Sequence, residues 1–186
     1  MTLRARLEEL IRFAEKAGYD WREPVREPIG NEQSAPVFAL MSGDPDFYCL
    51  TEDGKFVVRI NERGQFSERK IVSDRIEDIE KYLSFALGSD VRGRAGLPRL
   101  FLTSDPVVIG GSFGGFRIGG EPGNLSVTWS QDGVERSVSG LSRYDAGKFV
   151  KYSPFSAKQI RESFLDDSRR PLVAGSEPGT GEGPRT

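Results

Sequence analysis

Residues 37–69 read VFALMSGDPDFYCLTEDGKFVVRINERGQFSER, in which short apolar runs alternate with turn sequences. The turns contain glycine, which supplies the positive φ that tight connections between strands require. Asp53-Gly54 is the strongest hairpin signal among them. The pattern predicts an antiparallel meander with strands at 37–41, 47–51, 55–61 and 65–69.

Helical periodicity appears on both sides of this meander. Residues 3–17 place apolar side chains three and four positions apart, with Thr2 able to cap the helix and Gly18 able to end it. Residues 74–87 show the same spacing after Ser73 as a cap, and Gly88 is the expected stop. We therefore predict an N-terminal and a central helix.

In two connecting segments the apolar residues show neither helical nor strand periodicity. Residues 19–35 contain two prolines and a glycine, so we expect an irregular connection from which Trp21 folds back onto the core. Residues 91–100 contain three arginines with two glycines and a proline, and we expect a basic loop there. An anion contact is conceivable for this loop, but a solvated connection explains so few arginines more simply.

A second group of strands is predicted in the C-terminal half. We expect a strand at 106–109 and a hairpin of 125–130 with 134–138, in which Trp129 lies on the buried face. Residues 142–152 are a weaker helix candidate because Gly147 lies in the middle. Residues 157–165 follow a capping box formed by Ser156 and Gln159 and should form a short helix.

The order of these elements predicts the fold class. Strands that come in runs, rather than alternating with helices, favour a mostly antiparallel sheet. We predict an α+β fold with two hairpin or meander groups and with N-terminal, central and C-terminal helices packed on the sheet. Residues 1–165 should form one domain, and residues 166–186 have too few large apolar residues to fold and should be a flexible tail.

Composition restricts the possible partners. Of the 186 residues, 37% are hydrophobic and 29% are charged, as in ordinary globular proteins. The 26 basic and 28 acidic residues give a net charge of only −2, which disfavours nucleic acid as a partner. No apolar run approaches the roughly 20 residues of a membrane helix, so we expect no membrane contact and a cytoplasmic protein.

The chain contains one cysteine and no histidine. The absence of histidine excludes Ser-His-Asp and Cys-His nucleophiles, imidazole proton transfer and His-containing zinc sites. Cys49 lies in a predicted strand and is expected to be buried and inert. Asp44 and Asp46 are explained by turn chemistry, and Asp166 and Asp167 by solvation. We therefore predict no enzymatic activity, no metal and no cofactor.

The glycine-rich segment at 110–117, GGSFGGFR, is the most unusual part of the sequence. It lacks the glycine spacing of dinucleotide-binding loops. Gly110 and Gly115 have the spacing of a P-loop, but Phe116 and Arg117 stand where lysine and serine or threonine are needed. Nucleotide binding by this segment is therefore disfavoured.

Two interpretations of the segment remain. The glycines can form bulges and tight turns in a hairpin, with the phenylalanines in the core. Alternatively, a loop with few side chains enters a cleft on a partner, with Phe113 and Phe116 as apolar anchors and Arg117 as a forked donor. The candidate partner-binding residues are Gly110, Gly111, Ser112, Phe113, Gly114, Gly115, Phe116 and Arg117.

The helix at 3–17 running into Gly18-Tyr19-Asp20-Trp21, the meander and the segment at 110–116 together resemble actinobacterial immunity proteins of polymorphic toxins. Among these are immunity factors for secreted NAD glycohydrolases such as the tuberculosis necrotizing toxin. The resemblance implies a cytoplasmic antitoxin that binds its toxin domain one to one. It also implies that residues 110–117 enter the NAD cleft of the toxin and block it.

Two other functions remain open at this point. An export chaperone or adaptor for a secreted substrate would bind a protein without inhibiting it. A small enzyme that uses carboxylate or tyrosine chemistry would need a convergent cluster of acids in a deep pocket.

Overall fold

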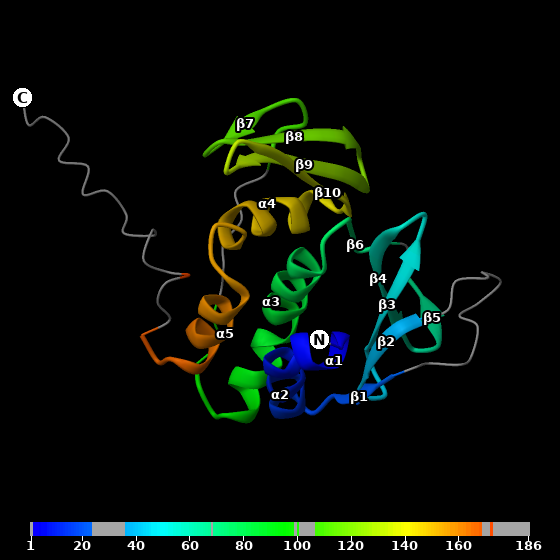
Figure 1. Ribbon diagram of the computed structural model, residues 1–186. Coiled ribbons are helices and arrows are strands. Elements are labelled where there is room, and N and C mark those ends of the chain that lie inside the picture. Colours follow the sequence, from blue (N-terminus) through cyan, green and yellow to red (C-terminus); the bar gives the residue numbers. More distant parts are fainter. Residues whose placement is uncertain are drawn as a thin grey trace, which may run out of the picture.

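The computed structural model describes residues 2–23, 36–67, 69–98, 100, 107–168 and 172. Within these residues, ten strands form one antiparallel sheet in the order β1-β2-β3-β4-β6-β10-β9-β8-β7, with β5 paired to β4 (Figure 1). The strands are β1 (Asp20–Arg22), β2 (Pro36–Met41), β3 (Asp46–Glu52), β4 (Lys55–Glu62), β5 (Gln65–Phe66), β6 (Ile71–Ser73), β7 (Ser112–Phe113), β8 (Phe116–Glu121), β9 (Asn124–Gln131) and β10 (Val134–Leu141). The predicted α+β class is confirmed.

The predicted meander is present as β2, β3 and β4. Cys49 of β3 lies opposite Val58 of β4, and Asp53 and Gly54 join these strands with φ angles of 49° and 73°. Of the fourth predicted strand, 65–69, residues 65 and 66 form β5. Strand β4 pairs with β5 at one end and with β6 over residues 56–58. Strand β6 itself was not predicted.

Strand β6 joins the two strand groups. Val72 lies opposite Val57 of β4 on one side and opposite Ser139 of β10 on the other. Figure 1 shows β1–β5 and β7–β10 as two groups set at an angle, with the helices between them. One core therefore receives side chains from both strand groups and from α2, α3, α4 and α5.

The N-terminal helix is divided into α1 (Leu3–Arg6) and α2 (Glu8–Ala17). The Thr2 hydroxyl accepts a hydrogen bond from the Ala5 amide at 3.2 Å, and Gly18 ends α2 with a φ of 86°. Both predicted end residues are confirmed. Trp21 stacks on Phe38 with ring centroids 4.3 Å apart, so its predicted return to the core is also confirmed.

Two expectations about 19–35 have different outcomes. Residues 20–22 form β1, which pairs with β2, so they are not irregular as predicted. Residues 24–35 lie outside the described residues. Strand β1 is only three residues long, which is too short to show a period in the sequence.

The central helix α3 (Ile76–Arg94) is longer than the predicted 74–87, and Gly88 is not its end. A Cβ atom added at Gly88 would lie 2.3 Å from the Phe164 ring of α5 (Ala157–Leu165). Glycine at this position permits close contact between α3 and α5. The packing gained in this contact outweighs the poor helix propensity of glycine. Ser73 is not the N-cap; its hydroxyl accepts from the Arg75 amide at 3.1 Å and donates to Asp78 at 2.7 Å.

The predicted basic loop at 91–100 is wrong in its first part. Residues 91–94 form the last turn of α3, and the Arg92 side chain is completely buried. Its guanidinium donates to the carbonyl oxygens of Pro98 at 2.6 Å and Asp166 at 2.8 Å, and to two carbonyls at the end of α5. Arg92 therefore stabilises the α3–α5 junction and is not an anion contact.

The C-terminal half is largely as predicted. Helix α4 (Arg143–Tyr152) begins after Ser142, whose hydroxyl accepts from the Asp145 amide at 3.1 Å. Helix α5 has the expected capping box of Ser156 and Gln159. The strand predicted at 106–109 is wrong, because residues 107–110 form no strand and Pro106 lies outside the described residues.

The predicted tail at 166–186 falls mostly outside the described residues. Leu172 is buried in the core. Within the described part of the chain, no helix is both long and apolar enough to cross a membrane.

Candidate functional site

The glycine-rich segment forms a hairpin at the end of the sheet, as one of the two interpretations predicted. We call residues 107–117 the finger. Phe113 of β7 lies opposite Phe116 of β8, and Gly114 and Gly115 join them with φ angles of 55° and 87°. Two residues with positive φ are typical of the tightest hairpin connections. The finger is therefore a β-structure with a tip that has no side chains.

Backbone hydrogen bonds hold the base of the finger. The Gly110 amide donates to the Ile118 carbonyl at 2.8 Å, and the Ile118 amide donates to the Gly111 carbonyl at 3.0 Å. From α4, the Arg143 side chain donates to the Val107 carbonyl at 2.8 Å. Helix α4 therefore fixes the point at which the finger leaves the core.

The two phenylalanines have different environments. Phe116 is only 8% exposed and packs against Trp129, with ring centroids 5.9 Å apart. Trp129 packs in turn against Phe149 of α4 at 5.7 Å. Phe116 is thus a core residue, and the expectation that its ring anchors a partner needs correction. Phe113 is 53% exposed and is available to a partner.

Other apolar side chains extend the exposed surface of the finger. Val108 is 66% exposed and Ile109 is 40% exposed, in the segment that leads into β7. Single exposed apolar residues are common on protein surfaces, but a contiguous group indicates an interaction site. The sequence did not identify Val108 and Ile109, because an apolar pair before a glycine run has the pattern of a buried strand.

A small cavity lies between the finger and α4. It has a volume of about 130 Å³ and is lined by Val107, Val108, Gly111, Ser112, Phe113, Ile118, Gly147, Val150 and Lys151. The half-exposed Phe113 forms part of its wall. Apolar concave sites next to exposed apolar groups are typical of places where a partner inserts a side chain.

Arg117 is directed away from this cavity. It forms an exposed ion pair with Glu135 of β10. Exposed ion pairs contribute little to stability, so a partner can replace this contact at small cost. Arg117 is thus accessible to a partner but already has an internal one.

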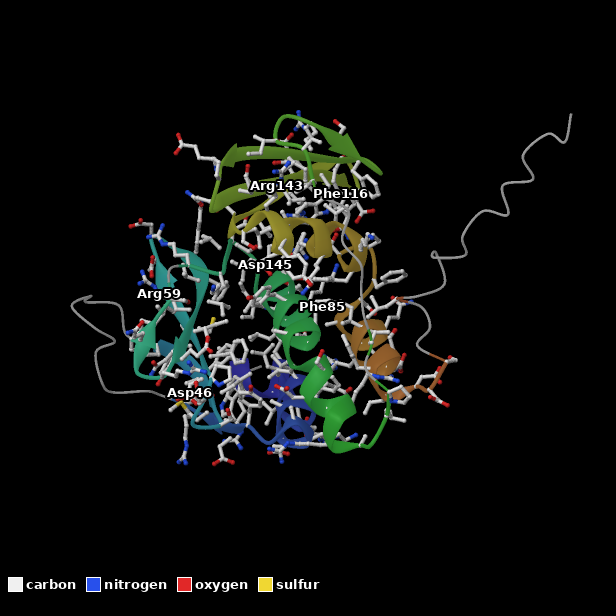
Figure 2. All side chains as sticks on the ribbon, turned by 180° about the vertical axis from the view of Figure 1, so that it is seen from behind. Asp46, Arg59, Phe85, Phe116, Arg143 and Asp145 are labelled. Atoms are coloured by element: carbon white, nitrogen blue, oxygen red, sulfur yellow. The ribbon has the colours of Figure 1, made fainter. Side chains whose placement is uncertain are left out.

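A larger cleft of about 660 Å³ lies between α3, α4 and the turn after β2. In it the Tyr19 hydroxyl donates to Asp90 at 3.1 Å, and burial together with the Asp90 charge raises the pKa of Tyr19 to about 12. Lys148 lies 3.9 Å from the centre of the Tyr144 ring and 5.7 Å from that of Phe85. Figure 2 shows Phe85 on α3 facing α4.

The remaining candidate groups have structural roles. Asp46 accepts from the amides of Ser42 and Gly43 at 2.8 Å each, and Asp44 accepts from the Arg63 amide at 3.1 Å. These contacts confirm the predicted turn chemistry. Cys49 is buried, and burial raises its thiol pKa well above the usual range.

Metal chemistry has no support in the described ranges. They contain no group of three or more histidine, cysteine, aspartate or glutamate residues that could hold a metal ion. Burial also raises the pKa of Tyr82 and of Tyr152, so both phenols are weaker acids than an exposed tyrosine. The most developed surface feature is therefore the finger with its cavity and α4.

Comparison with known proteins gives two matches. The family model described as Immunity protein 61 matches residues 13–172. The solved structure "Rv3902c from M. tuberculosis" superposes with a TM-score of 0.68 at 18% sequence identity, over 88% of this chain and 91% of that chain. At this identity the likeness concerns the fold. No curated protein matches the sequence.

Proposed function

The chain belongs to the Immunity protein 61 family, and we propose that it is the antitoxin of a secreted polymorphic toxin, whose NAD glycohydrolase activity we infer from the resemblance of the sequence to immunity factors of such toxins. Immunity proteins are typically not enzymes, in keeping with a chain that lacks histidine. The proposed partner is the toxin domain, bound one to one, and the proposed result is that its NAD cleft is blocked in the producing cell.

The exposed apolar surface of the finger carries this proposal. Val108, Ile109 and Phe113 are between 40% and 66% exposed, although the same hairpin buries Phe116 against Trp129. A chain that can bury one ring of a cross-strand pair has no folding reason to leave the neighbouring apolar groups in water. Binding to a partner would remove them from solvent.

The shape of the finger suits a nucleotide cleft. Its tip, Gly114-Gly115, presents backbone only, and Cβ atoms added there would meet nothing within 4 Å among the described residues. A tip of this kind can enter a narrow cleft, and the wider part with Phe113 then fills the entrance. The finger alone is too small for a stable complex, which buries about 1,600 Å² in total, so neighbouring surfaces must also take part.

The direct test measures NAD hydrolysis by the purified domain of a secreted NAD glycohydrolase toxin, whose gene we expect to lie next to that of this chain. Increasing amounts of the antitoxin should reduce turnover to zero at one equivalent. Binding without loss of turnover would contradict inhibition and would favour the export chaperone or adaptor. Absence of binding would contradict both functions for this toxin.

Phe113→Ala tests the contribution of the finger. Because the ring is half exposed, we expect the melting temperature to stay unchanged and the affinity for the toxin domain to fall about 30-fold or more, equivalent to about 2 kcal/mol. Leu165→Ala is the matched control, since Leu165 on α5 is a similarly exposed apolar residue at 40%. Equal affinities for both variants would show that the finger is not the binding site.

A further inference from the structure

The cavity between the finger and α4 is mostly apolar and opens to solvent. Its described lining consists of valine, isoleucine, phenylalanine and glycine, except for Ser112 and Lys151. Ile118 of β8 and Val150 of α4 are buried and form the inner part of the wall. Val108 and Phe113 also line the cavity but are each more than half exposed, so they lie at its opening.

Helix α4 contributes a glycine to the cavity wall. Gly147 lies in the middle of α4, where glycine is less favourable than alanine, and it adds only backbone atoms to the wall. Water is poorly held in a space of this kind, because a bound water molecule needs several polar partners and the described wall offers few. An apolar group that displaces such water gains affinity.

The volume of the cavity determines the size of the group that it can hold. The cavity measures about 130 Å³, and an apolar protein cavity of about 150 Å³ binds benzene. A single phenyl ring therefore fits. The Phe113 ring in the wall can pack against such a ring in an offset or edge-to-face arrangement, which adds to the apolar contact.

The cavity is continuous with the exposed surface of the finger. Phe113 belongs to both, since its ring is half exposed on the finger and also lines the cavity. Arg143 donates to the Val107 carbonyl at 2.8 Å and so holds the base of the finger on α4, which packs against the β7–β10 group in Figure 1. A stable complex needs more area than the finger supplies. A partner that covers Phe113 therefore also covers the opening of the cavity.

We propose that this cavity takes up one phenyl-sized apolar side chain of the toxin domain while the finger enters the toxin. This inference rests on the proposed function and adds a second, reciprocal anchor to the interface. Apolar anchors in fitted pockets supply much of the binding energy of a protein complex, and they act mainly by slowing dissociation.

Benzene binding to the free protein tests the cavity without the toxin. Benzene is titrated into the wild-type chain, and the methyl NMR signals of Val108, Ile118 and Val150 are followed. We expect saturable shifts of these signals and none for Val134, an exposed valine of β10 outside the described lining. The absence of saturable shifts, or an equal response at Val134, would overturn the proposal.

Val107→Phe tests the role of the cavity in the complex by filling it from the protein's own side. Val37→Phe is the matched control, because Val37 of β2 is also a half-buried valine packed against the core. We expect Val107→Phe to abolish the benzene shifts and to lower the affinity for the toxin domain about 10-fold. The control should bind within about twofold of the wild-type affinity. Calorimetric titration measures both.

Melting curves separate loss of binding from loss of fold. A folded Val107→Phe variant that binds the toxin domain as tightly as the control would refute the reciprocal anchor, while the antitoxin function stands. If Val107→Phe does not fold, Val150→Phe fills the cavity from α4 and repeats the comparison. Failure of the wild-type chain to bind the toxin domain would instead contradict the proposed function, and the benzene titration would still decide whether the cavity holds a ring.

Discussion

Glycine has opposite uses in the α3–α5 junction and in the finger. At Gly88 a Cβ atom would lie 2.3 Å from the Phe164 ring, so the residue makes room for a close helix contact. At Gly114 and Gly115 a Cβ atom would meet nothing within 4 Å among the described residues, but both φ angles are positive. The first region uses glycine for packing, and the second uses it for backbone conformation and for a bare surface. Stability should therefore be concentrated in the junction and binding in the finger.

The largest loss of stability is expected for Arg92→Leu. The buried guanidinium donates to backbone carbonyls of Pro98, Ser163, Phe164 and Asp166. Its removal leaves these acceptors without a donor in the interior, which should lower the free energy of unfolding by about 4 kcal/mol. Urea denaturation measures this change. Arg94→Leu, at an exposed position in the same helical turn, is the control and should stay within about 0.5 kcal/mol.

Phe116→Ala tests which part of the finger belongs to the core. The ring is buried against Trp129, so its removal leaves a cavity and should lower the free energy of unfolding by about 3 kcal/mol. Phe113→Ala, at the directly opposite position, should have almost no effect on stability. A thermal melt of each variant measures the difference. Equal losses for both would show that the finger is packed as a core element.

Gly88→Ala should have a smaller but clear effect. The added methyl group would contact the Cγ, Cδ2 and Cε2 atoms of the Phe164 ring at 2.3–2.4 Å, so the ring or α5 must move. Overpacking of this kind costs about 2 kcal/mol. The expected sign is opposite to that of an ordinary glycine to alanine change in a helix, which stabilises. A variant as stable as the wild-type chain would show that the junction has room to adjust.

The sequence predicted the elements in which local signals agree with the tertiary structure. Strands β2, β3 and β4, the β9–β10 hairpin and α5 have alternation, turn glycines or caps that determine them locally. The end of α3 was mispredicted because Gly88 is a helix-ending signal in isolation, and its contact with Phe164 depends on a residue far along the chain. Strand β6 was missed because its three residues are defined by their pairing with β4 and β10.

The candidate site was predicted only in part, for the same reason. The glycine run identified the finger, and the hairpin was one of the two interpretations of it. Which phenylalanine lies inside depends on Trp129 and Phe149, which the fold brings to Phe116 but not to Phe113. The exposure of Val108 and of Ile109 is also a tertiary property. No local pattern could have identified them.

Gly115→Ala should lower stability less than Gly88→Ala, and it tests the use of glycine in the finger. The φ of 87° disfavours any residue with a Cβ atom, at a cost of about 1 kcal/mol, and no described atom lies within 4 Å to add a steric cost. Gly93→Ala is the matched control, because its Cβ atom would also meet nothing among the described residues but its helical backbone suits alanine. Denaturation should show a small loss for Gly115→Ala and a small gain for Gly93→Ala. If Gly115→Ala were as stable as Gly93→Ala, backbone conformation would not explain the finger glycines, and bare surface alone would account for them.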